Sequence, residues 1–244
     1  MDLLVDEVIS HVSRDTFLPE TDVEYEMCFT RNKDLISQYK LLRKQLYETD
    51  HRFVGFRIFK ESDAEDYEDL DNHMLILFNG NECYGGACLR ISTPEKRVTL
   101  DLENDIVLAT DKKIFSLREH FPEMELEKYA YAELSRVVIH PSLRKGKATR
   151  GIFQAILRRC IDYRVRYLVG IGDKVRTRLY KQIYHAMGLD AYVRDDVDIC
   201  LLEEYEGLKM YLLVGDMKPF HMASNDTEAK VLLKPRTDYE YTYA

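Results

Sequence analysis

Two apolar runs separated by a tight turn occupy residues 73–92, and they constrain the fold more than any other feature of the sequence. Residues 74–78 and 84–91 each have the composition of a strand, and Asn79-Gly80-Asn81 between them is typical of a short hairpin turn. Strands joined by so short a connection run antiparallel. The sequence therefore predicts an antiparallel hairpin in the first half of the chain.

After this hairpin the apolar spacing alternates between strand and helix patterns. The predicted elements are strands at residues 129–139 and 167–171, helices at residues 148–163 and 177–187, and further strands at residues 198–202 and 209–214. The second of these helices ends at Gly188, in the position that a C-terminal capping glycine takes. An antiparallel run that passes into a strand–helix–strand unit predicts a mixed α/β or α+β fold.

The segments around the hairpin give weaker patterns. The first thirty residues are predicted to form an amphipathic helix followed by a turn at Leu18-Pro19-Glu20, and residues 34–48 repeat apolar side chains at helical spacing. The remaining predictions are a strand-like run at residues 52–59, an acidic run at residues 61–71, an irregular or strand segment at residues 97–108 and a short helix at residues 114–120.

The composition is that of a globular protein. The 244 residues are 45% hydrophobic, with only 11 Gly and 6 Pro, so a core is expected and no flexible linker stands out. We expect one domain over residues 1–215, with residues 216–244 as an extension that packs on it or trails from it. No apolar run reaches the roughly 18 residues of a membrane-spanning helix. The acidic N-terminus and five cysteines without CxxC spacing predict a cytoplasmic protein with reduced thiols.

The charge is distributed unevenly along the chain. The net charge is −8, yet residues 144–181 contain twelve Lys and Arg and only two acids. A basic segment in an acidic protein favours one localised anionic partner over general binding of nucleic acid. The alternative is a solvated helix face that happens to be basic, and the sequence leaves both readings open.

A loop rich in basic and small residues connects the strand at residues 129–139 to the helix that follows. A helix N-terminus after such a loop offers backbone N–H groups and the positive end of a dipole, which bind phosphate or pyrophosphate. The residues expected to take part are Arg144, Lys145, Gly146, Lys147, Ala148 and Arg150. Such loops occur in many proteins, so this one alone does not identify the ligand.

Read together, these features resemble the GCN5-related N-acetyltransferase (GNAT) superfamily. Tyr180, followed by Met187-Gly188-Leu189, resembles the late tyrosine and glycine signature of that fold. The resemblance implies that Val137, Val138, Ile139 and the loop after them cradle the pantetheine arm and phosphates of an acyl thioester. The loop from Leu143 to Gly151 departs from the family's usual Arg/Gln-x-x-Gly-x-Gly/Ala, which weakens the case for coenzyme A itself.

A narrower resemblance is to the acyl-homoserine-lactone (autoinducer) synthases and N-acyl amino acid synthases, which use acyl carrier protein as donor. The matching motifs, in chain order, are Arg43 with Tyr47, Asp66 with Asp69 before an apolar strand, Gly85-Gly86 with Leu89-Arg90, and Glu133-Leu134-Ser135-Arg136. They span roughly residues 35 to 190. The chain has no Trp, whereas autoinducer synthases usually carry one, which favours the N-acyl amino acid synthase side.

The resemblance implies roles for these residues in amide formation. The protonated amine must lose a proton before it attacks the thioester, and Glu133, with a pKa raised by burial, is the predicted general base. A strand glutamate held in a salt bridge is the alternative. Tyr180 is predicted to protonate the leaving thiolate, or else to pack in the core, and backbone N–H groups of residues 137–139 are predicted to stabilise the oxyanion.

On the amine side, the resemblance implies an ion-pair network. Its members are Asp66, Asp69, Arg90 and Arg136, which either order this wall of the site or bind the ammonium or carboxylate of the substrate. Arg43 either joins the network or binds a substrate carboxylate. Apolar side chains at residues 75, 77, 153, 157 and 187 either line an acyl tunnel or only pack the core.

The sequence therefore predicts a mixed α/β, GNAT-like N-acyltransferase. It would transfer an acyl chain from an acyl carrier protein or acyl-CoA thioester to an amino acid or a related small amine. The basic segment at residues 144–181 would dock the acidic carrier protein. We expect no permanently bound cofactor, no metal and no nucleic-acid partner. The alternatives are an acetyl-CoA-dependent acetyltransferase and a non-catalytic binding module on the same fold.

Overall fold

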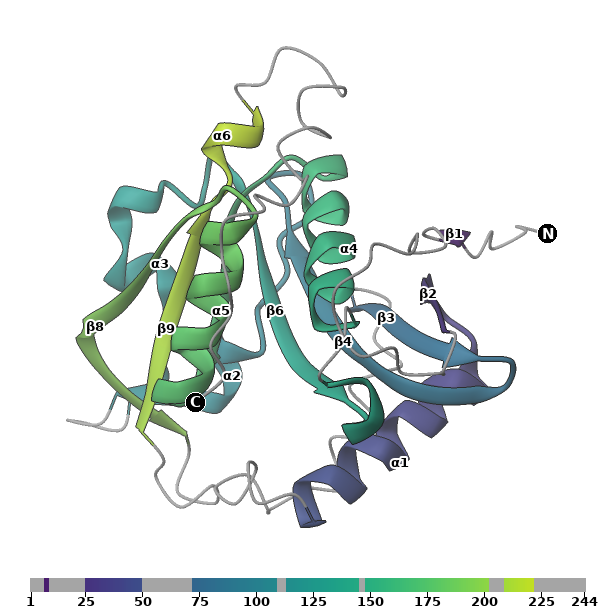
Figure 1. Cartoon of the computed structure of the whole chain (residues 1–244). Helices are drawn as coiled ribbons and strands as arrows, with labels where there is room; N and C mark the ends of the chain where they lie inside the picture. The colour runs from purple at the N-terminus through teal and green to yellow at the C-terminus, as the bar shows by residue number, and fades with distance from the viewer. Residues whose placement is uncertain are drawn as a thin grey trace. The chain divides into compact units, whose positions relative to one another are not determined.

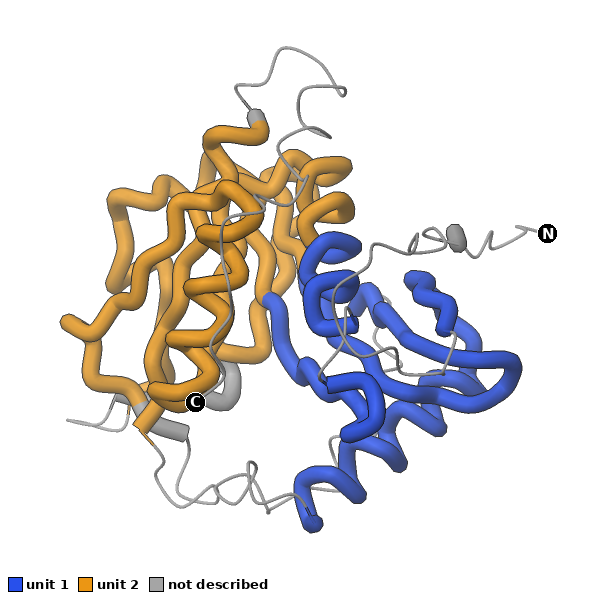
Figure 2. Tube along the Cα trace, viewed as in Figure 1, with its two compact units in different colours: residues 1–90, 134–156, 202–207 blue, residues 91–133, 157–201, 208–244 orange. Residues whose placement is uncertain are grey.

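The computed structural model of the chain describes residues 7–8, 25–49, 72–108, 113–144, 148–201 and 209–221. The strand-like run at residues 52–59, the acidic run at residues 61–71 and most of the first thirty residues lie outside this set. The chain divides into two compact units, drawn in blue and orange in Figure 2. The first comprises residues 1–90, 134–156 and 202–207, and the second comprises residues 91–133, 157–201 and 208–244. The predicted single domain over residues 1–215 stays a prediction.

The first unit is built on an antiparallel sheet in the order β1-β2-β3-β4. Its strands are β1 (Glu7–Val8), β2 (Glu26–Thr30), β3 (Asn72–Asn79) and β4 (Glu82–Ser92), which ends just inside the second unit. The predicted hairpin is confirmed, because β3 and β4 pair antiparallel with Asn79 opposite Glu82. Gly80 in the turn takes a positive φ of 56°, which glycine adopts without steric cost.

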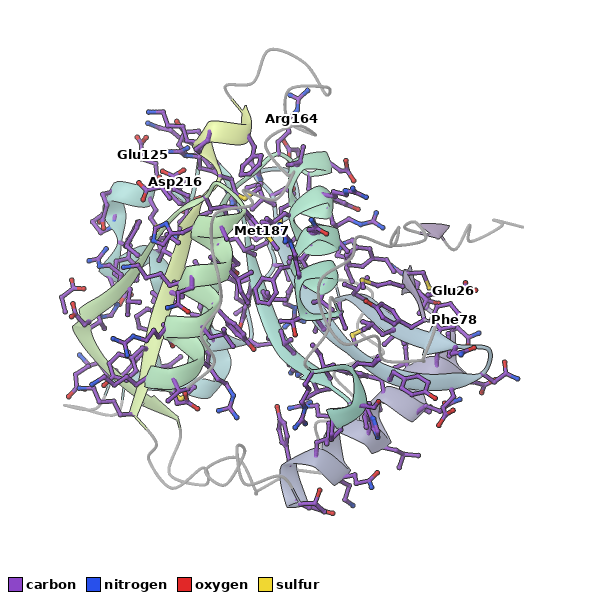
Figure 3. All side chains as sticks on the ribbon, viewed as in Figure 1. Glu26, Phe78, Glu125, Arg164, Met187 and Asp216 are labelled. Carbon is purple, nitrogen blue, oxygen red and sulfur yellow. The ribbon has the colours of Figure 1, made fainter. Side chains whose placement is uncertain are left out.

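The start of this unit differs from the prediction in two places. In the stretch expected to be helical before the turn at residues 18–20, only Glu7–Val8 is described, and it is a strand that pairs with β2. After that turn, Glu26–Thr30 is a strand that was not predicted, and it pairs with β3. Glu26 lies opposite Phe78 in this pairing, and Figure 3 labels both side chains. Met27, Cys28 and Phe29 are all buried. Three consecutive apolar residues are compatible with both the helical and the strand period, so the pattern alone does not distinguish them. Pairing with the edge of β3 selects the strand.

Helix α1 (Lys33–Thr49) covers the sheet of the first unit (Figure 1). It begins where the Asn32 side chain accepts hydrogen bonds from the N–H groups of Asp34 and Leu35, at 2.9 and 3.2 Å. Buried apolar side chains of the helix then recur at helical spacing. They form a core cluster with strand residues: Ile36, Tyr39, Leu46, Met74, Ile76, Cys83, Cys88 and Val138. The predicted helix at residues 34–48 is thus confirmed.

The first unit also contains the last six residues of β6 (Ala130–Ile139), the short 3-10 helix η4 (Pro141–Leu143) and the first part of α4 (Ala148–Asp162). The predictions of a strand at residues 129–139 and of a helix at residues 148–163 are confirmed. On β4, a Cβ added to Gly86 would lie 2.4 Å from the Leu75 carbonyl oxygen and 3.0 Å from the Tyr39 ring. Only glycine therefore fits beneath α1 at this position.

The second unit holds the rest of the sheet, in the order β7-β9-β8-β5. The strands are β7 (Val165–Gly172), β9 (Lys209–Asp216), β8 (Asp190–Leu201) and β5 (Ile106–Leu108), and these neighbours pair antiparallel. The start of β6 pairs with β7 in parallel, so the sheet of this unit is mixed. The predicted strands at residues 167–171 and 209–214 fall within β7 and β9. The predicted strand at residues 198–202 falls on β8 as far as Leu201, the last residue described there, and β8 is much longer than expected.

Helix α5 (Lys174–Ala186) packs against β7, β8 and β9. It begins at Asp173, whose carboxylate accepts the N–H groups of Val175 and Arg176 at 2.9 and 2.8 Å. It ends as predicted near Gly188, which takes a φ of 89°. The N–H groups of Gly188 and Leu189 return to carbonyls of the last turn at 3.0 Å each, which is the Schellman arrangement.

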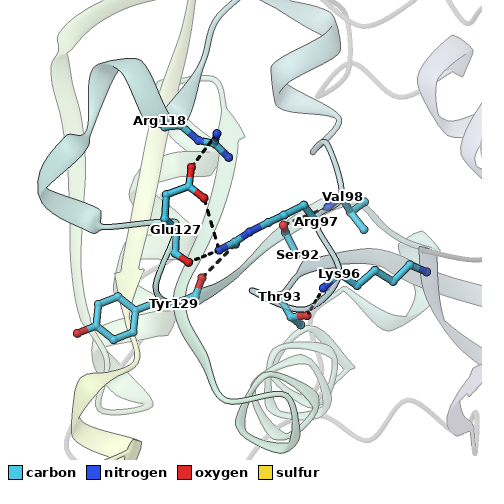
Figure 4. A network of polar contacts seen from close by, with 8 residues as sticks. All are labelled: Ser92, Thr93, Lys96, Arg97, Val98, Arg118, Glu127 and Tyr129. Atoms are coloured by element: carbon cyan, nitrogen blue, oxygen red, sulfur yellow. Dashed lines mark hydrogen bonds and ion pairs between the residues drawn. The ribbon is translucent and has the colours of Figure 1, made fainter.

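The smaller elements of this unit are α2 (Leu102–Asp105), α3 (Leu117–His120), the 3-10 helix η3 (Pro122–Met124) and α6 (Lys218–His221). A polar network ties the segment before α2 to the start of β6 (Figure 4). In it Arg97 donates to the carbonyls of Glu127 and Tyr129, at 2.6 and 3.4 Å, and Arg118 pairs with the Glu127 carboxylate at 2.7 Å. Within the described part of the chain, no helix is long and apolar enough to cross a membrane.

The contact at Gly86 predicts a large cost for adding one methyl group. We expect Gly86→Ala to lower the free energy of unfolding by about 1–3 kcal/mol, because its Cβ would collide with the backbone of β3. Gly151→Ala in α4 is the matched control. Its Cβ would meet only the mobile end of Met27, at 2.9 Å, and alanine favours a helix. Urea unfolding followed by circular dichroism measures both, and equal costs would contradict the argument.

Candidate functional site

Strand β6 carries most of the predicted catalytic residues. A charged side chain of this strand is buried, because Glu133 is only 1% exposed. Ser135, Arg136 and Val137 are half-buried. Its parallel pairing with β7 runs from Ala130 to Glu133, which lies opposite Val169. The carboxylate of Glu133 is thus carried by a paired stretch of backbone, which is a rigid support for a reacting group.

The buried carboxylate of Glu133 is held by a backbone donor. Its Oε2 accepts the N–H of Leu102, the first residue of α2, at 3.1 Å. The salt bridge that the sequence left open as the structural alternative for Glu133 stays a prediction. A buried carboxylate requires such donors to remain charged. Leu102 was not predicted to belong to the site, because residues 97–108 gave no clear pattern.

Arg136 adopts a backbone conformation that few residues with a side chain adopt. Its φ is 55°, in the left-handed region, which costs about 1–3 kcal/mol for a residue other than glycine. The hydroxyl of Tyr39, fully buried in α1, donates to the Arg136 carbonyl. Strand β6 is therefore distorted three residues after Glu133, and a side chain from α1 holds the distortion. Tyr39 was predicted only as a packing residue of the helix.

The predicted oxyanion and pantetheine segment follows the distortion. Val137 is half-buried, whereas Val138 and Ile139 are 1% and 8% exposed. A Cβ added to Gly85 of β4 would lie 2.7 Å from the Val138 carbonyl oxygen, so the glycine allows β4 and β6 to approach closely. The use of these backbone groups for binding stays a prediction.

The residues that directly follow β6 are held by several hydrogen bonds. Arg144 Nε donates to the Ile139 carbonyl at 2.7 Å. His140 Nδ1 lies 2.7 Å from Ser142 Oγ, and the His140 N–H donates to the Tyr84 carbonyl at 2.8 Å. Of the predicted phosphate-binding residues, Ala148 is buried at the start of α4 and Arg150 is half-buried. Lys145, Gly146 and Lys147 lie outside the described residues.

The predicted amine-side residues are only partly described. Arg43 is 7% exposed and its guanidinium lies 5.0 Å from the centre of the Tyr47 ring, so the two matched residues stack on α1. Arg90 is half-buried and lies opposite Asn72 in the β3–β4 pairing. Asp66 and Asp69 lie outside the described residues. The ion-pair network with Arg90 and Arg136 therefore stays a prediction.

Tyr180 lies in the middle of α5 and is half-buried. Its neighbour one turn later, Tyr184, is fully buried, and burial raises the pKa of Tyr184 well above its usual value, with Cys160 and Tyr180 adding to the effect. Tyr184 is therefore a core residue, and Tyr180 is the more exposed of the two residues. The role of Tyr180 as an acid stays a prediction.

The residues predicted to line an acyl tunnel are all buried. Leu75, Leu77, Phe153 and Leu157 are fully buried and Met187 is 2% exposed. The burial agrees equally with a tunnel wall and with simple core packing. Among the described side chains, no group of three or more His, Cys, Asp or Glu residues has an arrangement that could hold a metal ion.

The sheet and the helices described above define a GNAT-like acyltransferase fold. The chain combines a mixed, largely antiparallel sheet with helices α1, α4 and α5, and the predicted fold class is confirmed. No protein-family model matches the sequence, and no curated protein matches it.

Similar solved structures extend this likeness. The chain is similar to FeeM, an N-acyl amino acid synthase from uncultured soil microbes, with a TM-score of 0.55, 12% identity and coverage of 80% of this chain and 92% of that chain. A CoA-dependent acyl-homoserine lactone synthase, BjaI, gives a TM-score of 0.50 at 16% identity, covering 82% and 81%. An uncharacterized protein from Bacillus halodurans gives a TM-score of 0.50 at 10% identity, covering 90% and 94%. At these identities the likeness is one of fold.

The bond between Tyr39 and Arg136 predicts a measurable loss in a conservative variant. We expect Tyr39→Phe to lower the free energy of unfolding by about 1–3 kcal/mol, because the distorted β6 carbonyl loses its buried donor. Tyr84→Phe is the matched control, since its hydroxyl meets the exposed Glu82 at 2.8 Å, and we expect a change within about 0.5 kcal/mol. Urea unfolding measures the free energy of unfolding of both variants. An equally small decrease for Tyr39→Phe would contradict the role given to its hydroxyl.

Proposed function

We propose that the protein is an N-acyltransferase that moves an acyl group from the thioester of an acyl carrier protein or acyl-CoA to the amine of an amino acid or a related small amine. One observation carries the proposal: a carboxylate, Glu133, is almost fully buried on β6 of a GNAT-like fold. The similar FeeM is an N-acyl amino acid synthase, and the similar BjaI is a CoA-dependent acyl-homoserine lactone synthase. Acyl transfer to an amine is the chemistry that these two have in common.

In the proposed reaction, Glu133 removes a proton from the substrate ammonium. The neutral amine attacks the thioester carbonyl carbon, and a C–N bond forms as the carbonyl oxygen becomes an oxyanion. Backbone N–H groups of residues 137–139 stabilise this oxyanion. The C–S bond then breaks as the departing thiolate takes a proton from Tyr180. The nitrogen of the intermediate loses its remaining extra proton, which restores the Tyr180 hydroxyl, and the Glu133 proton passes to solvent. The products are an amide and the free thiol of the donor.

The remaining predicted residues bind the two substrates in this proposal. Arg144, Lys145, Gly146, Lys147, Ala148 and Arg150 would bind the donor phosphates at the N-terminus of α4. Arg43, Asp66, Asp69, Arg90 and Arg136 would shape the amine side. The basic segment at residues 144–181 would dock an acidic carrier protein, and Arg158, Arg164, Lys174 and Arg178 of this segment are exposed. We expect the protein to act in the cytoplasm.

The donor and the amine can be identified in one assay. Purified protein is mixed with long-chain acyl carrier protein or with acetyl-CoA and a panel of amino acids, and the released thiol is measured. We expect release with the carrier-protein donor and one class of amine. Release with acetyl-CoA alone would assign the protein to acetyl-CoA-dependent acetyltransferases, and no release with any donor would overturn the proposed function.

The role of Glu133 is tested by replacing its charge while keeping its shape. We expect Glu133→Gln to lower kcat by about 10²–10⁴-fold, because the amide accepts the Leu102 N–H but cannot take a proton. Asp216→Asn is the matched control. It weakens an ion pair with Arg166 at 2.7 Å, so we expect lower stability with unchanged turnover. Equal kcat in the Glu133→Gln variant and the unmodified protein would exclude the carboxylate as the base.

A further inference from the structure

The backbone donor that holds Glu133 belongs to a turn that a second glutamate fixes. Leu102 N–H donates to Glu133 Oε2 at 3.1 Å, and Leu102 is followed directly by Glu103. Glu103 Oε1 accepts the N–H of Leu117 at 3.1 Å, and its Oε2 accepts the N–H of Leu100 at 3.4 Å. Both oxygens of Glu103 therefore bind backbone, on each side of the Glu133 contact.

The turn itself is short and closed. The Glu103 N–H donates to the Leu100 carbonyl at 3.0 Å, so the segment from residue 100 to residue 103 is tied at both ends. Leu100, Leu102 and Leu117 are at most 1% exposed. Their side chains anchor the turn and the start of α3 in the core, and Glu103 is the polar link between these two segments. Its position therefore determines where the Leu102 N–H points.

The direction of that N–H matters for a general base. A carboxylate on a flexible side chain can rotate about its last bonds, and each rotation moves the oxygen that takes the proton. A hydrogen bond from a fixed backbone donor selects one orientation, as outer hydrogen-bond partners do for catalytic groups. A displacement of the order of 1 Å at a reacting group costs about 100-fold in rate.

We propose that Glu103 is a positioning residue for Glu133: by tying residue 100 to residue 117, it fixes the Leu102 N–H that orients the Glu133 carboxylate. This inference rests on the proposed function, in which Glu133 is the base. Glu103 itself touches neither substrate. Glu103 belongs to no motif identified in the sequence, and its role follows from the three hydrogen bonds that meet at this turn.

The first test is the kinetics of Glu103→Gln. The amide keeps one acceptor oxygen, so it can hold Leu100 or Leu117 but not both, and the variant is expected to remain folded. We expect kcat to fall at least tenfold while KM for donor and amine changes less than twofold, because binding is untouched and the base is misoriented. Glu125→Gln, which removes only the exposed partner of Lys128, is the control and should leave both constants unchanged. Unchanged kcat in Glu103→Gln would overturn the proposal.

A double variant separates positioning from general destabilisation. If Glu103 acts through Glu133, Glu103→Gln should cause no further loss when added to Glu133→Gln, measured on the residual thiol release at high enzyme concentration. An independent, additional tenfold loss in the double variant would show that Glu103 acts by another route and would overturn the proposal.

A readout independent of turnover keeps the two proposals distinguishable. Amide hydrogen exchange of the full chain should show faster exchange at Leu102 and Leu117 in Glu103→Gln than in the unmodified protein, with no change in Glu125→Gln. Unchanged exchange at Leu102 would overturn the positioning role, whatever the assays show. If exchange accelerates but no donor gives thiol release, the proposed function fails while the link between Glu103 and the Glu133 contact stands.

Discussion

The left-handed backbone at Arg136 is the constraint to which the first unit is adapted. A residue with a side chain adopts this conformation only when its surroundings hold it there. Here the Tyr39 hydroxyl holds the carbonyl, and the glycines of β4 leave room for the backbone of β6 and for the Tyr39 ring. The spacing that buries one face of α1 brings Tyr39 to this carbonyl. Helix, glycine pair and distorted strand therefore depend on one another.

A similar dependence governs the other end of β6. Glu133 is buried because it lies on a strand paired with β7, and a buried carboxylate is tolerated only where donors reach it. The donor comes from a turn that the core anchors through Leu100 and Leu102. Within the second unit, the packing of an apolar turn thus sets the surroundings of the most chemically capable residue. The contacts of this turn therefore serve both the stability of the second unit and the proposed chemistry at Glu133.

The elements with long, regular apolar spacing could be predicted from the sequence, whereas the short ones could not. Helices α1, α4 and α5 and the β3–β4 hairpin follow directly from periodicity and from turn and cap residues such as Gly80 and Gly188. Strand β2 was missed because its five residues carry no clear period, and only the edge of β3 selects the extended form. The length of β8 was underestimated because its middle is acidic, and pairing with β9 extends it past those residues.

The same distinction applies to the site. Residue type and motif were sufficient to select Glu133 and Arg136, but not the groups that hold them, because those bonds join positions 31 and 97 residues apart. A contact between a side chain and a distant backbone group leaves no signal in a single sequence. The structure shows that this strand breaks local rules twice within four residues, with a buried carboxylate at Glu133 and a left-handed backbone at Arg136. Such departures concentrate where function requires them, which is the physical reason to test the chemistry on β6 first.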